Sequence, residues 1–556
     1  MDQPDHAPDR RAFLGLAGAV AATLTQVMTG AAPATAATPP RPPASRAGEG
    51  RTVAVLGAGP AGLAAALRFG SAGYRVTVLE AQGRVGGRTL TARPGDRITE
   101  VWADGSTRSL TCRFDQGLYL NLGAGRIPYH HQRVLEFCRT LRVPLEPYVH
   151  TSTANLFRSD AAWQGTPKPN RRIANDTRGH VAEHLHRALE LGSQASDGLT
   201  PAQRERFAEL LVSFGALDPD DRRYHGSTRS GLAARPAVPQ QEEPVDPLAL
   251  ADLLDSGFWE HGFYQDSELH WHTTSFQPVG GMDSIWRAAA AALPAGVLKL
   301  DCPVRSVQLD GEGVVVGWSE GGTERQQRFD HCLSNVPLPV LHRQVALTGV
   351  TEDFRTAVRD TPFAPACKVG WQANRRFWES ERYQIYGGIS WVDHEIRQIW
   401  YPSNDYFSAT GKGTLTGAYN SYGAAEAFGD RPHDERISTA RSAAARLHDE
   451  FASPTVVPGE LALSVAWHKI PHQLGAWADW RPADPEHKHL YTTLMYPQGE
   501  NAFLVIGDQV SALPGWQEGA LMSAEWAFEQ IAGGRREARV PAHRVPDSRA
   551  LTTGGL

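Results

Sequence analysis

Short apolar runs alternate with a helical pattern near both ends of the chain. The β-branched run 52–56 predicts a buried strand, the Ala- and Leu-rich stretch 61–72 predicts a helix, and the run 75–79 predicts a second strand. Further on, the run 503–506 predicts another buried strand and leads into a helical stretch that ends near residue 531. This alternation indicates a βαβ unit within an α/β fold.

The middle of the chain has a different character. Residues 130–275 are richer in His, Arg and Glu and show helical periods around 179–192 and 201–217. The Pro-, Gln- and Glu-rich segment 235–247 between the patterned parts predicts a loop. We interpret this region as a helical insertion in a second domain.

Length and charge narrow the classes of function. At 556 residues the chain exceeds what one hydrophobic core usually serves, which predicts two domains or one large body with an insertion. Its 55 Lys and Arg against 61 Asp and Glu give a formal charge of −6, so we expect no nucleic-acid and no anionic-membrane partner. Five cysteines, an odd number without close pairs, predict buried thiols rather than a disulfide framework or a zinc knuckle.

The first residues resemble a targeting segment. Residues 9–14, Asp-Arg-Arg-Ala-Phe-Leu, precede a mildly apolar stretch and the small-residue site 34–36, Ala-Thr-Ala. This order resembles a bacterial twin-arginine signal, which exports proteins already folded. We therefore expect a signal peptide over 1–36, a flexible lead-in over 37–50, and a bacterial protein that acts extracellularly or in the cell envelope. The later sequence has no run of about 18 uncharged apolar residues, so we expect no membrane span in the mature form.

The first βαβ unit carries a dinucleotide-binding pattern. Gly-Ala-Gly-Pro-Ala-Gly over 57–62 follows the first strand at once, and the second strand ends at an acid, Glu80. Glycines let the backbone approach a pyrophosphate, a helix N-terminus offers free N–H groups, and the acid accepts hydrogen bonds from ribose hydroxyls. The residues predicted to bind the dinucleotide here are Gly57, Gly59, Ala61, Gly62 and Glu80.

A second glycine-rich segment follows the acid. Residues 83–91, Gly-Arg-Val-Gly-Gly-Arg-Thr-Leu-Thr, place arginines on both sides of paired glycines. Backbone and guanidinium donors of this kind suit the pyrophosphate of FAD, and such a segment separates FAD proteins from simple NAD dehydrogenases. We therefore predict FAD, with contacts from Arg84, Gly86, Gly87 and Arg88.

The segment Leu-Gly-Ala-Gly-Arg-Ile-Pro over 122–128 makes the pattern more specific. With the motifs above, the chain resembles the flavin-containing amine oxidase family, and more narrowly its L-amino-acid oxidases, from about residue 51 to about 532. The resemblance implies that Arg126 binds the substrate carboxylate, which a guanidinium fork can grip bidentately. Gly125 stands where the family usually has Met, which leaves the shape of the local pocket open. The segment's implied FAD contacts are Gly123, Ala124, Gly125 and Arg126.

Three further positions extend the resemblance. Lys368 lies in an apolar stretch where the family's lysine holds a water against flavin N5. Tyr401 matches the tyrosine whose hydroxyl assists the arginine at the substrate carboxylate. The segment 277–283 resembles the return of the chain to the FAD domain, and Val304 matches the residue that meets the adenine.

The C-terminal signature is the strongest. Leu-Pro-Gly-Trp-Gln-Glu-Gly-Ala over 513–520 opens the last helix, whose N-terminus would stabilise negative charge on the reduced flavin. The resemblance implies that Trp516 walls the substrate cage and that Asp508 stands where the family more often has Glu. Because residues 480–535 contain no Cys, where covalently flavinylated relatives carry theirs, we expect non-covalent FAD. The residues implied here are Gly507, Asp508, Gly515, Trp516 and Ala520.

The resemblance implies oxidative deamination of an L-amino acid. Arg126, Tyr401, Gly515 and Trp516 would hold the substrate so that the Cα hydride passes to flavin N5, with Lys368 and Trp516 as the catalytic side chains. The imine would hydrolyse to a 2-oxo acid and ammonia, and O2 would become hydrogen peroxide. An amine oxidase without amino-acid selectivity, an amino-acid 2-monooxygenase and an exported flavoprotein without turnover remain alternatives. The accepted side chain and a homodimeric state also stay open.

Histidines of the middle region are weighed separately. His131 matches a histidine in the family's helix after the arginine, and we expect it to cap or pack rather than to catalyse. His270 and His272 could share one strand face, but no third ligand is evident near them, so we expect no metal site.

Together these assignments predict the fold class α/β (α+β overall). An FAD-binding Rossmann-like βαβ domain would be built from discontinuous segments and joined to a mixed-sheet substrate domain with a helical insertion, and the active site would lie at their junction. We expect the FAD-binding domain over 51–115, 276–340 and 481–535, the substrate domain over 116–275 and 341–480, and a disordered tail over 536–556.

Overall fold

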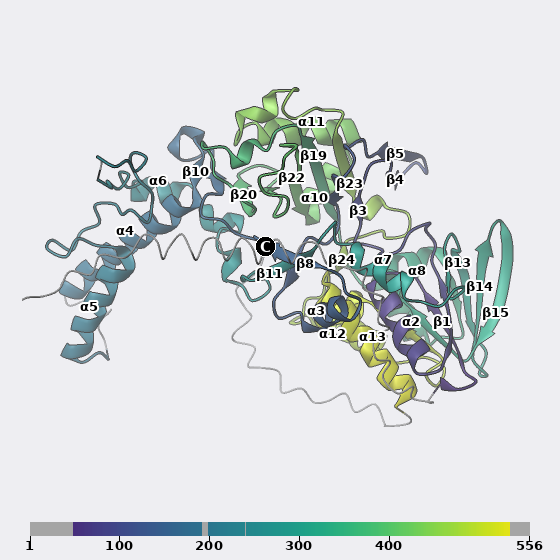
Figure 1. Cartoon of the computed structure of the whole chain (residues 1–556). Helices are drawn as coiled ribbons and strands as arrows, with labels where there is room; N and C mark the ends of the chain where they lie inside the picture. Colours follow the sequence, from purple (N-terminus) through teal and green to yellow (C-terminus); the bar gives the residue numbers. More distant parts are fainter. Residues whose placement is uncertain (1–47, 192–197, 240, 534–556) are drawn as a thin grey trace, which may run out of the picture. The chain divides into compact units, whose positions relative to one another are not determined.

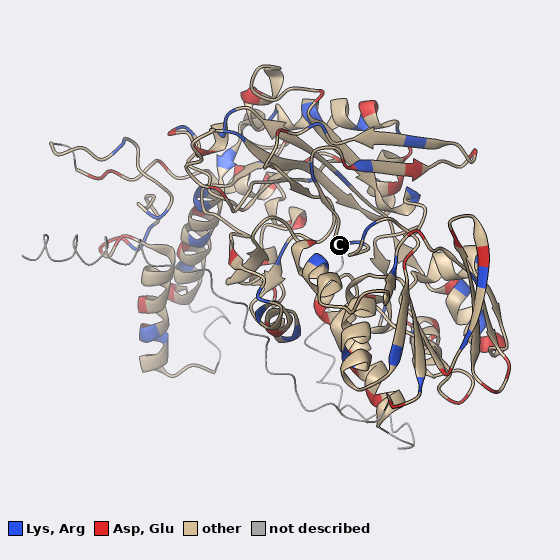
Figure 2. Ribbon diagram, turned by 45° about the vertical axis from the view of Figure 1, so that its right-hand side comes forward, with Lys and Arg blue, Asp and Glu red and all other residues tan. Residues whose placement is uncertain are grey.

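The structure is a computed structural model that describes residues 48–191, 198–239 and 241–533 (Figure 1). The expected signal peptide, most of the expected lead-in and the expected tail lie outside the described residues. All five cysteines are buried and free, as predicted. Lys and Arg are interspersed with Asp and Glu over the described helices and strands (Figure 2). Within the described ranges, each helix is too short or too polar to span a bilayer.

A parallel sheet contains the predicted βαβ unit. Its strand order is β12-β2-β1-β16-β25, and every pair is parallel. Its strands come from three widely separated stretches of the chain, so the predicted Rossmann-like fold built from discontinuous segments is confirmed. The bounds of this unit are β1 (Thr52–Leu56), α2 (Pro60–Ser71), β2 (Arg75–Leu79), β12 (Leu298–Lys299), β16 (His331–Ser334) and β25 (Phe503–Val505).

Helices cover this sheet through a shared apolar core. Helix α13 packs against α2, and their apolar faces join side chains of β1 and α7 in one buried cluster that includes Val53, Phe69, Trp286 and Ala527. Small residues of α2 let the two helices approach closely, and burial of this cluster is the main stabilising term for the layer. The bounds are α7 (Ser284–Ala291) and α13 (Gln517–Ala532).

A four-stranded sheet adjoins the parallel one and has the order β15-β14-β13-β17. Its outermost strand, β15, is exposed along nearly its whole length and carries the polar run Thr-Glu-Arg-Gln-Gln-Arg, which protects an edge from pairing with other chains. The bounds of this layer and its helices are β13 (Val304–Leu309), β14 (Val314–Glu320), β15 (Thr323–Phe329), β17 (Ala346–Thr348), α8 (Leu338–Gln344), α9 (Glu352–Asp360) and α12 (Pro485–Met495).

A mixed seven-stranded sheet forms the second body, in the order β10-β9-β20-β21-β22-β19-β23. All eight residues of β19 are buried, and α10 and α11 pack against the strands around it. The bounds are β9 (Leu156–Arg158), β10 (Lys168–Pro169), β19 (Ala366–Ala373), β20 (Ile389–Val392), β21 (Gln398–Trp400), β22 (Gly413–Ser421), β23 (Ala462–Ala466), α10 (Tyr422–Gly429) and α11 (His433–Ala444).

The helical insertion is present where its periodicity predicted it. Helix α4 is longer than the predicted 179–192, while α5 begins at a capping box made by Thr200 and Gln203 and ends close to the predicted residue. The described part of 235–247 consists of turns and irregular backbone with isolated bridges, one of them between Pro244 and Leu232, as predicted for a loop. The bounds are α4 (Asn170–Glu190), α5 (Pro201–Gly215) and α6 (Leu250–Asp255).

Four short antiparallel sheets complete the described fold. The most important is the sheet β7-β11-β8, because β7 directly follows Arg126 and is followed by α3. The remaining bounds are β3 (Thr91–Ala92), β4 (Arg97–Val101), β5 (Thr107–Thr111), β6 (Leu120–Asn121), β7 (Ile127–Pro128), α3 (Gln132–Thr140), β8 (Leu145–Tyr148), β11 (Ser275–Pro278), β18 (Phe363–Ala364) and β24 (Trp477–Ala478).

Candidate active site

A cavity lies along the carboxyl ends of the parallel strands, where open α/β sheets bind their ligands. Residues after β1, β2, β16 and β25 all contribute to it, and so do β13, β19 and the N-terminus of α13. The predicted residues that line this cavity are Gly57, Gly59, Glu80, Gly87, Arg88, Gly123, Ala124, Val304, Lys368, Asp508, Gly515, Trp516 and Ala520.

The first glycine-rich turn forms a backbone cradle at one end of the cavity. Gly57 has φ of +93°, a conformation that favours glycine, and its N–H donates to the carbonyl oxygen of Leu79 at 2.8 Å. A Cβ on Gly62 would lie 2.0 Å from the carbonyl oxygen of Gly57, so only glycine lets α2 approach this turn. Gly59 is the N-cap of α2, and a Cβ there would lie 2.7 Å from Nδ2 of Asn335. Ala61 and Gly62 are buried beneath the cradle.

One acidic and one basic side chain hold the turns of this cradle. The carboxylate of Glu80 accepts the backbone N–H of Ala58 at 2.7 Å and of Gln82 at 2.9 Å, and burial raises its pKa. Arg84, expected to face the pyrophosphate, instead donates to the carbonyl oxygen of Gly87 at 2.9 Å. It therefore stabilises the turn around Gly86 and Gly87 from within.

At the other end, an ion pair ties the second glycine-rich segment to the last helix. Arg88 forms a two-pronged pair with Asp508, with one Nη1 to Oδ2 distance of 3.1 Å. Oδ2 of Asp508 also accepts the N–H of Gly515 at 2.8 Å, just before α13. Gly507, at φ of +117°, makes the turn that brings Asp508 into place. The N-terminus of α13 is thus fixed at the cavity, where it favours negative charge.

The residues present fit FAD. The cavity joins a glycine cradle at a helix N-terminus, an acid at the end of the second strand, a guanidinium at the paired glycines and a second helix N-terminus. The cradle is narrow: neighbouring atoms already occupy the positions that a Cβ atom would take at Gly59 and Gly62. A backbone that approaches so closely suits a pyrophosphate, and Val304 offers an apolar contact beyond the acid.

Arg126 is a buried cation with unsatisfied donors. The residue is 6% exposed, and its Nε and Nη2 atoms are buried without a hydrogen-bond partner among the described residues. The guanidinium carbon lies 3.7 Å from the ring centre of Trp271 and 5.1 Å from that of Trp516. Burial lowers its pKa to about 10, so the group stays charged at neutral pH. A buried, unpaired charge is costly, so this site is suited to an anionic partner.

Lys368, on β19, lies close to Arg126 and lines the cavity. Its Nζ donates to the carbonyl oxygen of Gly123 at 2.6 Å and lies 4.8 Å from the ring centres of both Trp400 and Tyr419. Burial, and secondly the charge of Arg126, lowers its pKa to about 7. The amine can therefore be neutral or charged near physiological pH.

The structure corrects the assignment of Tyr401. Its hydroxyl donates to Ser390 at 2.8 Å and contacts Nε2 of His448 inside the apolar core of the second body. Successive strand residues face opposite sides, and Trp400 is the one that faces the cations, with its ring centre 6.0 Å from the guanidinium carbon of Arg126. The sequence match was thus displaced by one residue along the strand. Tyr401 contributes only to a second, smaller cavity beside Trp400.

Trp400 also explains the glycine at position 125. A Cβ on Gly125 would lie 2.9 Å from the indole of Trp400, so this ring occupies the space that a longer side chain would need. The shape of the pocket, left open by the sequence, is therefore set by an aromatic ring from β21. This pairing of a small residue with a large neighbour is a volume exchange of the kind that packed interiors require.

The histidines differ from their predicted arrangement. His270 and His272 lie in a turn rather than on a strand, and Nε2 of His272 pairs with the carbonyl oxygen of Ser267 at 2.8 Å. His131 packs against Trp516, with ring centres 5.0 Å apart, in agreement with the prediction of packing. No third ligand near His270 was evident from the sequence, but in the structure His130 and His131 both contact it.

Sequence reasoning missed three residues that shape the site. Trp271, stacked on Arg126, follows a histidine in an irregular segment whose pattern gives no direction for its ring. Tyr419 on β22 lines the cavity beside Lys368, and Asn335 lies against the glycine cradle. For Asn335 a signal existed, since it directly follows a buried run of the parallel sheet, the position where ligand contacts gather.

The fold and the cavity define a dinucleotide-binding flavoprotein with a buried cation beside the cofactor site. The sequence profile described as "Flavin containing amine oxidoreductase" matches residues 60–531. The chain therefore belongs to the flavin-containing amine oxidoreductase family, and the predicted family and cofactor are confirmed.

Several named proteins are similar to this chain. The flavin-dependent L-tryptophan oxidase RebO of Lentzea aerocolonigenes is 26% identical over 507 residues, which covers 87% of this chain and 98% of that protein. The putative L-amino-acid oxidase YobN of Bacillus subtilis is 23% identical, with 85% and 92% covered, and the L-amino-acid oxidase of Mus musculus is 27% identical, with 88% and 71% covered. A putrescine oxidase variant shares the fold, with a TM-score of 0.55, 19% identity, and 87% and 99% covered.

Proposed function

We propose that this protein is an FAD-dependent oxidase of L-amino acids, which produces the 2-oxo acid, ammonia and hydrogen peroxide. One observation carries the proposal: a buried guanidinium with two unpartnered nitrogen atoms lies beside the flavin cavity. A substrate carboxylate would satisfy these donors and neutralise the charge of Arg126. A simple amine has no group to do so. The similar proteins, which are named as oxidases of tryptophan or of L-amino acids, support the same substrate class.

The side chains around Arg126 have distinct roles in this proposal. FAD, when bound, would accept the hydride from the substrate Cα and pass the electrons to O2. Trp271 fixes the plane of the guanidinium by stacking, which orients a bound carboxylate. Trp516 and Trp400 close the site with aromatic rings and exclude water. Lys368, held by the carbonyl oxygen of Gly123, would orient a water molecule with its remaining donors.

The substrate is tested by a peroxide-coupled screen of the purified flavoprotein against the twenty L-amino acids, their D-enantiomers and simple amines. We expect peroxide from one or a few L-amino acids. Equal turnover of amines without a carboxylate would instead indicate an unselective amine oxidase. An amide product without matching peroxide would indicate a 2-monooxygenase, and flavin that stays oxidised with every compound under anaerobic conditions would indicate a protein without turnover.

The role of Arg126 is tested by Arg126→Ala with Arg139→Ala as the matched control. Arg139 lies on α3, its side chain is 71% exposed, and it pairs with Glu136 one turn away on the same helix. Loss of one partner of a buried charged pair costs about 2–5 kcal/mol, which corresponds to a rise in KM of about 30-fold or more. The control should leave KM unchanged. A KM in Arg126→Ala within a factor of two of the wild type would refute carboxylate anchoring.

We further propose non-covalent FAD and export by the twin-arginine route. The absence of Cys from 480–535 supports the first, and the order of charge, apolar stretch and small residues over 9–36 supports the second. Acid precipitation should release all the flavin into the supernatant. Replacement of both Arg10 and Arg11 by Lys should retain the precursor inside the cell, whereas unchanged export would exclude this route.

A further inference from the structure

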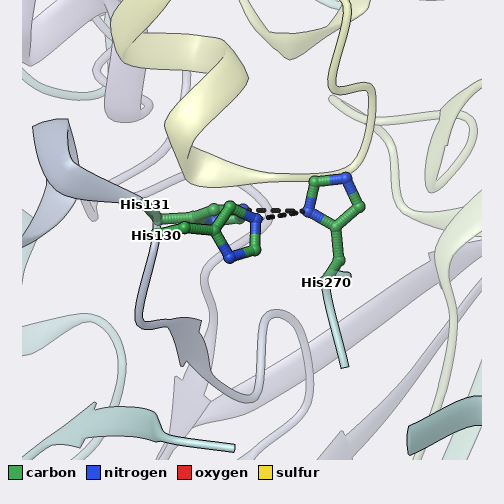
Figure 3. Close-up of side chains that lie close together, drawn as sticks. All are labelled: His130, His131 and His270. Atoms are coloured by element: carbon green, nitrogen blue, oxygen red, sulfur yellow. Dashed lines mark hydrogen bonds between the residues drawn. The ribbon is translucent and has the colours of Figure 1, made fainter. Parts of the chain in front are cut away.

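Three imidazole rings converge beside the substrate cage. Nε2 of His130 lies 2.9 Å from Nδ1 of His270, and Nε2 of His131 lies 3.3 Å from the same atom. Figure 3 shows both rings pointing toward one nitrogen of His270. The three ligand atoms lie within 4.8 Å of one another. Two come from the turn before α3 and one from the irregular segment before β11, so the tertiary fold brings them together.

Tetrahedral zinc bound by imidazole at about 2.0–2.1 Å places its ligand nitrogens about 3.3 Å apart. Two of the three separations here, 2.9 and 3.3 Å, are close to that value, and the third is no more than 4.8 Å. Catalytic zinc sites use three protein ligands, in some cases three histidines, and leave the fourth position open. Nitrogen-only donors suit Zn²⁺, Cu²⁺, Ni²⁺ or Co²⁺ and do not suit Ca²⁺ or Mg²⁺, which need oxygen ligands.

We propose that His130, His131 and His270 form a binding site for one divalent transition-metal ion such as Zn²⁺, with a fourth position open to solvent. None of the three histidines lines the FAD cavity, although Trp516, which does, lies against both His131 and His270. The proposal does not depend on the proposed substrate. In the structure His130 and His131 both contact the same nitrogen of His270. A bound ion would replace these two contacts with three bonds, one from each imidazole ring.

The surroundings determine how such an ion would act. Arg126 is the nearby positive charge and opposes a cation, while Glu518 is the nearby negative charge. The ion would connect the turn after Arg126 to the segment that carries Trp271, its stacking partner. Metal binding would thus stiffen both sides of the substrate cage.

The experiment uses the full-length holoprotein without a polyhistidine tag, freed of metal with a chelator and passed over a desalting column. Zn²⁺ binding is followed by calorimetry, and bound zinc per flavin is measured by mass spectrometry. The variants are His270→Ala and His130→Gln. The matched control is His272→Ala, two residues further along the chain, where Nε2 pairs with the backbone oxygen of Ser267. Flavin content per chain verifies the fold of every variant.

We expect one Zn²⁺ per chain in the wild type and in His272→Ala. Replacement of a residue that only supports a ligand weakens metal binding by about 10- to 100-fold. Loss of a direct ligand should weaken it further, in both His270→Ala and His130→Gln. No saturable binding in the wild type would overturn the proposal. Binding of the same strength in either ligand variant would also overturn it. If His270→Ala fails to retain flavin, His130→Gln decides the outcome alone, because His130 is only partly buried.

Discussion

The unusual lysine beside the flavin cavity leads to a quantitative prediction. Burial lowers the pKa of Lys368 from its ordinary value of 10.5 to about 7. Between these values the unfolded chain carries a proton on this amine and the folded chain does not. The free energy of unfolding therefore rises with pH across this window. As the pH falls toward 7, the folded protein loses this stability, because only the unfolded chain gains a proton on the amine. A difference of about 3.5 pH units corresponds to about 5 kcal/mol, an order-of-magnitude figure.

Replacement of Lys368 by Met removes this dependence and keeps a side chain of similar length. At saturating FAD, Lys368→Met should be more stable than the wild type at pH 7 by several kcal/mol, less about 1 kcal/mol for the lost hydrogen bond to Gly123. The difference should shrink by about 1.4 kcal/mol per pH unit as the pH rises. Urea unfolding of both proteins at pH 7, 8 and 9 measures it, because every other titrating group cancels in the difference.

The six lysines of the chain allow a direct check by NMR with ¹³Cε-labelled lysine. The resonance absent from Lys368→Met should titrate with a midpoint near pH 7. Lys412→Met is the matched control, since this lysine is 39% exposed and pairs with Asp115 at the surface. A stability difference that stays flat from pH 7 to 9, or a Lys368 resonance that titrates near the ordinary lysine value, would refute the reasoning.

Three other substitutions test separate features of the structure. Gly62→Ala should lower the flavin-to-protein absorbance ratio, because its Cβ meets a backbone oxygen at 2.0 Å and overpacking costs about 1–3 kcal/mol; full flavin loading would contradict the cradle. Tyr401→Phe should leave KM unchanged while it lowers stability by about 1 kcal/mol, and a large rise in KM would restore Tyr401 to the substrate site in place of Trp400. Glu100→Gln should lower the unfolding free energy by about 3–5 kcal/mol, because it leaves the fully buried Arg436 without its charged partner; an unchanged melting temperature would contradict this.

The cofactor half of the fold was readable from the sequence because its signals are local. The strand, glycine turn, helix and acid over 52–80 are contiguous, and each has a fixed backbone requirement. The last strand and helix were found in the same way, through the apolar run 503–506 and the turn before α13. The boundaries of the domains stay a prediction, since sequence patterns mark elements more reliably than they mark the limits between packed bodies.

The substrate side was harder to predict because its geometry depends on contacts distant in sequence. Arg126 and Lys368 were identified by resemblance. The side to which a ring at a short strand points depends on the strand register. The match was off by one residue, so Tyr401 was assigned to the site in place of Trp400. Trp271 and the histidine group depend on an irregular segment that meets residues about 140 positions away. Periodicity gives no direction for such a segment.

The strand order of the parallel sheet has a consequence for how the protein is made. β1 and β25 share this sheet, with only β16 between them, yet they are about 450 residues apart in the chain. At about 5–20 residues per second, a ribosome delivers the second of them roughly 20 to 90 s after the first. Until then the glycine cradle exists without α13, and the edge of β16 is uncovered. Assembly of the cofactor site therefore waits for the late synthesis of β25 and α13, and the nascent chain needs protection from aggregation until then.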